Sequence, residues 1–181
     1  MLTKTALDDV FIIEPKVFMD ERGWFMETFS CKNVPQITCN FIQDMHSYSK
    51  RKGTLRGIHF QCPPMEQSKL VRCIRGAFMD IVVDLRLASS TYKQWITVEL
   101  SAENKKQVFI PHGFGHAVMT LEDNTEILYK VDNYYSPEHE RTIHWSDPDI
   151  CINWEEFSLN PILSKKDSEA PSLRDLTIWQ N

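Results

Sequence analysis

Large apolar residues alternate with polar ones over many short stretches of this chain, and clusters of turn residues separate the stretches. An alternation with a period of two is typical of β-strands that bury one face. Residues 77–85 form the most apolar of these stretches, and a β-rich segment at 9–17 is interrupted by Pro15. Strands are predicted at residues 24–29, 41–49, 69–74, 77–85, 95–100, 107–110, 117–121 and 125–132.

Short strands at regular spacing, joined by turns, predict an all-β sandwich or barrel. The turn residues between Pro111 and His116 are expected to lead into the strand at 117–121. Beyond about Pro148 the alternation weakens and predicts a loop-rich tail with one short helix near Trp154. The sequence has no repeat, low-complexity segment or linker, so residues 1–181 are expected to form one domain.

The net charge narrows the range of ligands. The chain of 181 residues carries a formal charge of -5 and no dominant basic stretch, which argues against a nucleic-acid partner. An anionic ligand must therefore be held by a local cluster of cations. The five cysteines are odd in number and lack CxxC spacing, so we expect reduced thiols and a cytoplasmic protein. Residues 1–18 contain no long apolar run, so neither a signal peptide nor a membrane span is expected.

The stretch LRGIHFQCPPMEQSK, residues 55–69, concentrates chemically useful side chains between two predicted strands. Its two prolines exclude a continuous helix and predict a strand, a turn and the next strand. Arg56 offers a planar donor for phosphate or carboxylate, His59 can exchange a proton near neutral pH, and Lys69 adds a compact positive charge. For this stretch alone, a basic hairpin with a structural histidine is the favoured interpretation.

Five motifs in a fixed order decide between these interpretations. They are LRGIHFQ, KLVRCIRGAFMDIVVDLR, SAENKKQVFIPHGFGHAV, ILYKVDNYYSPEHE and LSKKDSEAP. Together, over roughly residues 20–171, they resemble the nucleotide-sugar 3,5-epimerases that act on dTDP-4-dehydro-6-deoxyhexoses. The resemblance implies a cupin-type double-stranded β-helix, or jelly-roll barrel, a homodimer, and an isomerase without a cofactor.

The residues suit this chemistry, because the carbons C3 and C5 beside a C4 ketone carry acidic protons and inversion needs a base on one face and an acid on the other. The resemblance implies that His59 is the base and Tyr129 the proton donor. Asp167 would orient His59, and Lys69 would stabilise the enolate oxygen at C4. Two alternatives stay open, a tyrosine packed in the barrel for Tyr129 and a solvated loop charge for Asp167.

Substrate-binding residues also follow from the resemblance. It places Tyr135 against the base of the nucleotide, although a surface aromatic before a turn is the alternative. The other positions that match binding residues of the family, for the diphosphate, the sugar or the nucleotide, are Arg22, Glu27, Gln43, Arg56, His116, Glu140 and Lys166.

The chain departs from the family pattern at Met45, where relatives usually carry asparagine, and the basic turn after it is about one residue longer. This segment lies near the nucleotide in relatives, so a GDP-linked 4-keto heptose is an alternative substrate to a dTDP-hexose. Inversion of a single carbon is a second alternative, because the same base and acid serve both carbons.

Two other classes of cupin are weaker hypotheses. Metal-dependent cupins carry His-x-His in the first motif, where this chain reads His59-Phe60-Gln61. His59 and His116 alone are too few ligands for a catalytic metal, so no metal site is expected. A sugar-binding cupin without catalysis would not need base, acid and carboxylate together.

Overall fold

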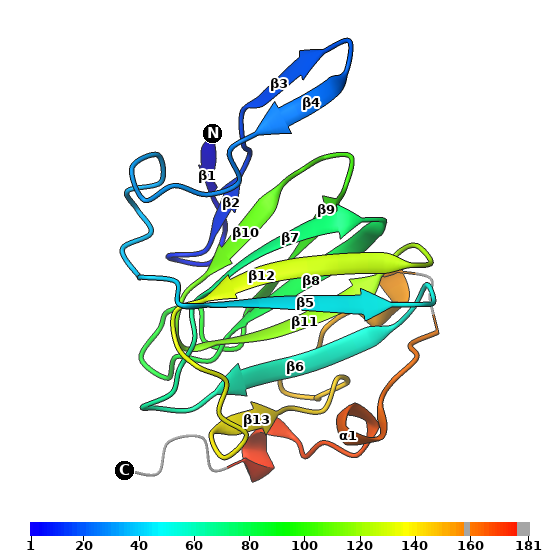
Figure 1. Cartoon of the computed structure of the whole chain (residues 1–181). Helices are drawn as coiled ribbons and strands as arrows, with labels where there is room; N and C mark the ends of the chain where they lie inside the picture. Colours follow the sequence, from blue (N-terminus) through cyan, green and yellow to red (C-terminus); the bar gives the residue numbers. More distant parts are fainter. Residues whose placement is uncertain (158–159, 177–181) are drawn as a thin grey trace.

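The computed structural model describes residues 1–157 and 160–176, and strands dominate them (Figure 1). The two main sheets are antiparallel, with strand orders β1-β2-β10-β7-β12-β5 and β13-β6-β11-β8-β9, and β3 pairs with β4 in a separate hairpin. The strands are β1 (Leu2–Lys4), β2 (Phe11–Ile13), β3 (Val17–Asp20), β4 (Gly23–Met26), β5 (Gln43–Ser49), β6 (Leu55–Gln61), β7 (Lys69–Arg75), β8 (Ala77–Asp84), β9 (Trp95–Ser101), β10 (Gln107–Ile110), β11 (Phe114–Thr120), β12 (Thr125–Val131) and β13 (Glu140–Thr142).

The two sheets face each other in the cupin-type jelly roll that was predicted, and three apolar clusters hold the layers together. Val71 and Ile127 of one sheet pack between the sheets against Phe78 and Val118 of the other. A second cluster joins the outer face of the five-stranded sheet to the tail through Trp154 and its neighbours. The third covers part of the six-stranded sheet with the segment around residues 34–37. The outer face of each sheet is thus partly covered by residues outside the two sheets, from the 34–37 segment or from the C-terminal tail.

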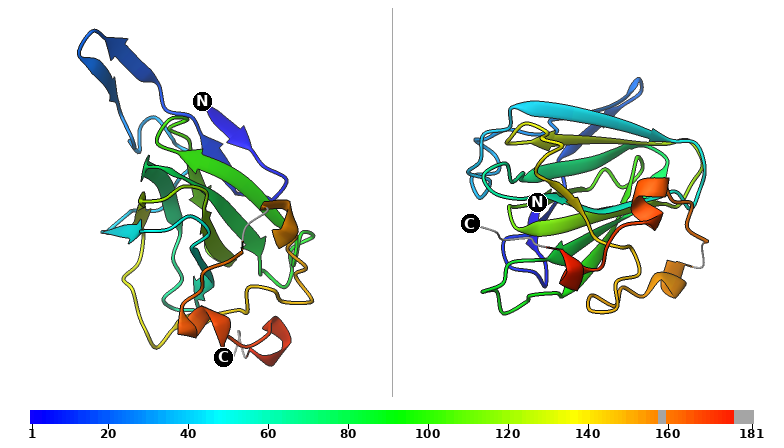
Figure 2. Two further views of the ribbon diagram at one scale, coloured as in Figure 1. Left: turned by 90° about the vertical axis from the view of Figure 1, so that its right-hand side faces the viewer. Right: turned by 90° about the horizontal axis from the view of Figure 1, so that it is seen from below.

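The C-terminal tail is loop-rich, as expected, and its short helix near Trp154 is a 3₁₀ turn, η1 (Trp154–Phe157). Two further turns follow, α1 (Lys165–Ser168) and η2 (Leu173–Asp175). Figure 1 shows this orange and red tail lying beside β6 and β13, with the β3–β4 hairpin standing away from the sheets at the other end of the molecule. The two turned views in Figure 2 show the same projection of the hairpin. Within the described part of the chain, no helix has the length and apolar character needed to cross a membrane.

Several predicted strands agree with the structure to within a residue or two, but three predictions were wrong. The strand at 24–29 ends at Met26, because its partner β3 ends the pairing there. The turn 111–116 stops at Gly113, and β11 already begins at Phe114, in register with β8. Gly115, which suggested a turn, instead allows close packing, since a Cβ there would lie 2.6 Å from Ile58 Cγ2. The hairpin interpretation of residues 55–69 also fails, because β6 and β7 belong to different sheets.

An extra residue in β6 shapes the inner surface of the barrel. His116 pairs with His59, but Val118 pairs with Arg56, so three steps along β6 match two along β11. Side chains three apart in a regular strand point to opposite faces, and a bulge of this kind turns them to the same side. Arg56 and His59 consequently line one cavity. Gly57 lies inside the bulge with φ +125°, in contact with β11.

We predict that Gly57→Ala destabilises the chain more than Gly23→Ala does. The two glycines have similar φ angles, +125° at Gly57 and +134° at Gly23. A Cβ at Gly57 would lie 2.6 Å from Ala117, whereas one at Gly23 would meet nothing within 4 Å. The steric clash should add about 1–3 kcal/mol to the cost of backbone strain. Urea unfolding of the two variants measures the difference, and equal losses would mean that β11 moves aside.

Candidate active site

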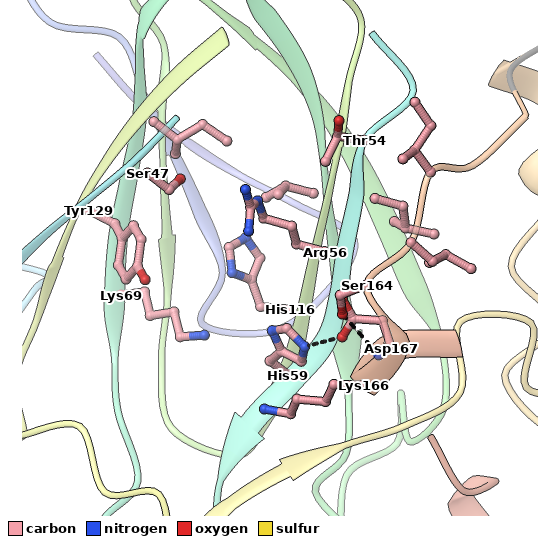
Figure 3. A pocket seen from close by; sticks show the side chains of 15 residues that line it. Ser47, Thr54, Arg56, His59, Lys69, His116, Tyr129, Ser164, Lys166 and Asp167 are labelled. Atoms are coloured by element: carbon pink, nitrogen blue, oxygen red, sulfur yellow. Dashed lines mark hydrogen bonds and ion pairs between the residues drawn. The ribbon is translucent and has the colours of Figure 1, made fainter. Parts of the chain in front are cut away.

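A cavity of about 490 Å³ opens between the two sheets, and catalytic residue types line it (Figure 3). β6 contributes His59, β7 Lys69, β11 His116 and β12 Tyr129, and Asp167 enters from α1. A second cavity of about 210 Å³ shares His59, Lys69 and Tyr129 with the first. The two cavities therefore adjoin and form one elongated site.

His59 and Asp167 form the best-defined pair in this site. The distance from His59 Nε2 to Asp167 Oδ1 is 2.6 Å, and Asp167 is only 3% exposed. Ser164 caps α1: its hydroxyl donates to Asp167 Oδ2 at 2.8 Å and accepts from the Asp167 N–H. Burial raises the pKa of the Asp167 carboxyl, but the hydrogen bond and charge of His59, the Ser164 hydroxyl and the charge of Lys166 together outweigh burial and hold the pKa below its usual range. The alternative of a solvated loop charge was therefore wrong.

Tyr129 and Lys69 stand across the cavity from this pair. Figure 3 shows both side chains on the side away from Asp167, without a hydrogen bond to the other side chains drawn. Burial raises the pKa of the Tyr129 hydroxyl, against a smaller effect of Arg56. Burial also lowers the pKa of the Lys69 ammonium to about 8, although the carboxylates of Asp80 and Glu140 offset part of the change. The two groups remain available to a ligand in the cavity.

His116 lies beside His59 on the neighbouring strand and has its own carboxylate. Its Nε2 is 2.9 Å from Oδ2 of Asp80, a residue with no exposed surface. Burial lowers the pKa of His116 despite this carboxylate, and the charge of Lys69 adds to the lowering. The other Asp80 oxygen, Oδ1, has no hydrogen-bond partner among the described residues. Sequence analysis missed Asp80, although an acid in the middle of the most apolar strand was a usable signal.

Further predicted binding residues gather at the second cavity. Glu140 accepts hydrogen bonds from the Tyr135 hydroxyl at 3.0 Å and from the Lys166 ammonium. Gln43 Oε1 accepts from the Tyr135 N–H at 3.1 Å, so Gln43 supports the tyrosine. Arg56 remains on the first cavity, where its guanidinium donates to the Tyr48 carbonyl oxygen at 3.2 Å. Arg56 and Lys166 thus line the first cavity, and Tyr135 lines the second.

Two predicted binding residues lie elsewhere. Arg22, at the tip of the β3–β4 hairpin, has an 85% exposed side chain and an ion pair with Asp20 at 2.6 Å. Glu27 accepts a hydrogen bond from Asn33 at 2.5 Å. Neither residue lines the two cavities of its own chain. In the two described ranges, no group of three or more His, Cys, Asp or Glu side chains could hold a metal ion.

The cupin-type barrel and this set of side chains define the class of nucleotide-sugar epimerases. The family model described as dTDP-4-dehydrorhamnose 3,5-epimerase matches residues 4–175, and the chain belongs to that family. The epimerase of this name from Salmonella typhimurium is 49% identical over 176 residues, which cover 96% of this chain and 95% of the relative. The one from Methanothermobacter thermautotrophicus is 45% identical over 179 residues, 97% of this chain and 96% of its own. The family predicted from the five motifs is therefore confirmed.

Solved structures agree with this assignment. The dTDP-6-deoxy-D-glucose-3,5-epimerase from Legionella pneumophila, in complex with dTDP-4-keto-L-rhamnose, superimposes with a TM-score of 0.91 at 42% identity. That comparison covers 97% of this chain and 94% of the Legionella chain. A 3'-monoepimerase from Streptomyces bikiniensis in complex with dTDP-quinovose has a TM-score of 0.87 at 32% identity, covering 94% and 86% of the two chains.

We predict that the Lys69 ammonium titrates near pH 8 and that Asp80→Asn lowers this midpoint. The protonated form dominates below the pKa, and removing a nearby negative charge favours the neutral amine. NMR titration of ¹³C-labelled lysine side chains measures the midpoint, with Lys69→Arg to assign the resonance. Asp84→Asn, which removes another buried carboxylate from β8, is the matched control and should leave the midpoint unchanged. If the Lys69 midpoint is unchanged in Asp80→Asn, Asp80 is excluded as the neighbouring charge.

Proposed function

We propose that this chain inverts C3 and C5 of a dTDP-linked 4-keto-6-deoxyhexose, with His59 as base and Tyr129 as acid. The observation that carries the proposal is their placement on opposite walls, His59 on β6 of one sheet and Tyr129 on β12 of the other. A planar enolate held between the sheets would meet the base on one face and the acid on the other. Inversion requires this arrangement.

In the proposed reaction, His59 Nδ1, the ring nitrogen that does not face Asp167, removes the proton from the carbon beside the C4 ketone, and the electron pair of that bond moves to the C4 oxygen. Asp167 orients the imidazole and stabilises its protonated form, as the 2.6 Å contact supports. The Lys69 ammonium stabilises the enolate oxygen. Tyr129 then delivers its hydroxyl proton to the opposite face, and solvent restores both groups.

The diphosphate would lie along the cationic side of the site. Arg56 and Lys166 supply positive charge, and His116 with its neutralised ring supplies a hydrogen bond to the sugar. Tyr135 would stack on the base, with Glu140 and Gln43 fixing its position. Met45 lines the second cavity, so the family departure lies at the proposed nucleotide end.

A homodimer would bring Arg22 and Glu27, which line neither cavity of their own chain, to the substrate site of a second copy. The β3–β4 hairpin exposes Phe18, Met19, Trp24 and Phe25, and it projects from the body of its own chain (Figure 1). Large exposed apolar groups of this kind are typical of protein interfaces. We infer that a second copy covers the hairpin, and that Arg22 and Glu27 reach the substrate of that copy.

Two alternatives within the family remain outcomes of the experiment. The Streptomyces bikiniensis relative is a 3'-monoepimerase, so inversion of one carbon is the first. A GDP-linked 4-keto heptose is the second, because Met45 alters the nucleotide end. Incubation with dTDP- and GDP-linked 4-keto sugars in D2O, followed by NMR at each carbon, distinguishes all three possibilities.

We predict that Tyr129→Phe separates proton exchange from inversion. The variant keeps the ring and loses only the hydroxyl, so His59 and Lys69 can still form the enolate, but nothing delivers a proton to the far face. In D2O, deuterium should enter the acidic position with retained configuration, as followed by NMR. His59→Ala is the matched comparison and should lose exchange and inversion together, by a factor on the order of 10²–10⁴. Normal inversion by Tyr129→Phe would assign the acid to another group.

We further predict that two inactive variants complement each other. A hybrid dimer of His59→Ala and Arg22→Ala protomers has one intact site if Arg22 serves the partner's cavity. Co-expression in equal amounts should restore about a quarter of the wild-type rate, since half the dimers are hybrids with one intact site each. The rate is measured on the co-purified mixture, with each variant alone as control. No recovery would mean that Arg22 serves its own chain.

A further inference from the structure

The side chain of Gln61 connects two loops at the rim of the second cavity. Gln61 is the last residue of β6, opposite Glu140 of β13, and it is 7% exposed. One loop, residues 62–68, joins β6 to β7, and the other, residues 132–139, joins β12 to β13. In Figure 1 this second loop runs down from the end of β12 to β13, and so from one sheet to the other.

The Gln61 amide is hydrogen-bonded at both ends. Its Nε2 donates to the carbonyl oxygens of Met65 and, at 3.1 Å, of Tyr134, while its Oε1 accepts from the Ser136 N–H at 2.6 Å. Two of these three main-chain partners, Tyr134 and Ser136, flank Tyr135 in the sequence. Only a side-chain amide offers donors and an acceptor together in this geometry. Glutamate or leucine at this position would leave buried main-chain groups unpaired, which costs stability.

Other contacts brace the same loop without replacing Gln61. Gln43 Oε1 accepts from the N–H of Tyr135 itself. Gln67 Nε2 donates to the Asn133 carbonyl oxygen at 2.8 Å, and Asn133 Nδ2 donates to the Pro64 carbonyl oxygen at 3.3 Å. Tyr135 is 47% exposed, so packing alone does not fix its ring. The orientation of the aromatic therefore depends on the hydrogen bonds that hold its main chain, together with the one from its hydroxyl to Glu140.

We propose that Gln61 is a positioning residue for nucleotide binding, which it controls by fixing the loop that carries Tyr135. The inference rests on the proposed function, in which Tyr135 stacks on the base of the nucleotide. It assigns Gln61 no contact with the reacting carbons. Loss of the Gln61 hydrogen bonds should therefore weaken binding of the nucleotide and leave the chemical step intact.

A double-mutant cycle with dTDP as the probe tests the inference. Calorimetry should show that Gln61→Leu weakens dTDP binding about tenfold, within the range for residues that act through one another. In the Tyr135→Ala background the same change should have no further effect, because the ring that Gln61 positions is already absent. With the 4-keto sugar substrate, KM should rise while kcat changes little.

Two further variants distinguish a specific effect on dTDP binding from a general loss of stability. Gln61→Glu has the same size and keeps the acceptor for Ser136, but it repels the Met65 and Tyr134 carbonyls, so it should weaken dTDP binding in the same direction. Thr125→Val is the matched control, since it removes buried hydrogen bonds to the Ala77 and Glu122 carbonyls at the opposite end of β12. It should leave the affinity for dTDP unchanged. Thermal unfolding of all variants shows that each is folded.

The possible failures are distinguishable. If the wild-type chain binds neither dTDP nor GDP, the proposed function fails and the inference fails with it. If the wild type binds and Gln61→Leu binds equally well, only the inference is overturned. A full loss of affinity on Gln61→Leu in the Tyr135→Ala background would also overturn it, because Gln61 would then act independently of Tyr135.

Discussion

The contact between Asp167 and His59 is the constraint on which the site depends. It joins a residue of the C-terminal tail to a central strand far away in the sequence, and it buries a carboxylate that is only 3% exposed. A buried charge is costly unless it is paired and hydrogen-bonded. The N-cap of α1 helps to meet that condition, because the Ser164 hydroxyl donates a hydrogen bond to Oδ2 of Asp167, while Oδ1 contacts His59. The short helix is thus required to present Asp167 in a state that supports His59.

The electrostatics of the inner surface follow from the alternation of charges across neighbouring strands. Asp80 and Glu140 lie close enough to Lys69 to favour its ammonium form against burial. His116, between Asp80 and the cations, has its pKa lowered by burial and by Lys69. Near neutral pH the ammonium form of Lys69 therefore dominates, and burial disfavours a positive charge on the neighbouring His116. In the proposed reaction, the Lys69 ammonium, which has no hydrogen bond to the side chains drawn in Figure 3, would face the negative charge that develops on the enolate.

Much of the fold followed from short alternating or apolar runs between turn residues: β5 alternates between half-buried and exposed positions, whereas β8 and β10 are buried almost throughout. The errors arose where tertiary pairing overrides composition. Phe114 to His116 looks like a turn, yet the chain pairs with β8 along the whole stretch. The bulge at Gly57 was not predictable, since it depends on the register between β6 and β11. The list of site residues came from the family motifs, but their grouping and the distance of Arg22 from its own cavity needed coordinates.

Gln61 shows why the same motif supports different chemistry in one fold class. In metal-dependent cupins the residue two after the first histidine is a second histidine, and sequence analysis interpreted Gln61 only as a missing ligand. The structure gives the amide three main-chain partners on two loops. An imidazole has one donor or two, but it cannot donate to two carbonyls and accept from an N–H at once. At the motif position where metal-dependent cupins carry a histidine ligand, this chain thus carries a glutamine whose amide holds the two loops at the rim of the cavity. In the proposed function the order of that rim matters, because the reacting carbons and the nucleotide base would lie at different ends of the same ligand.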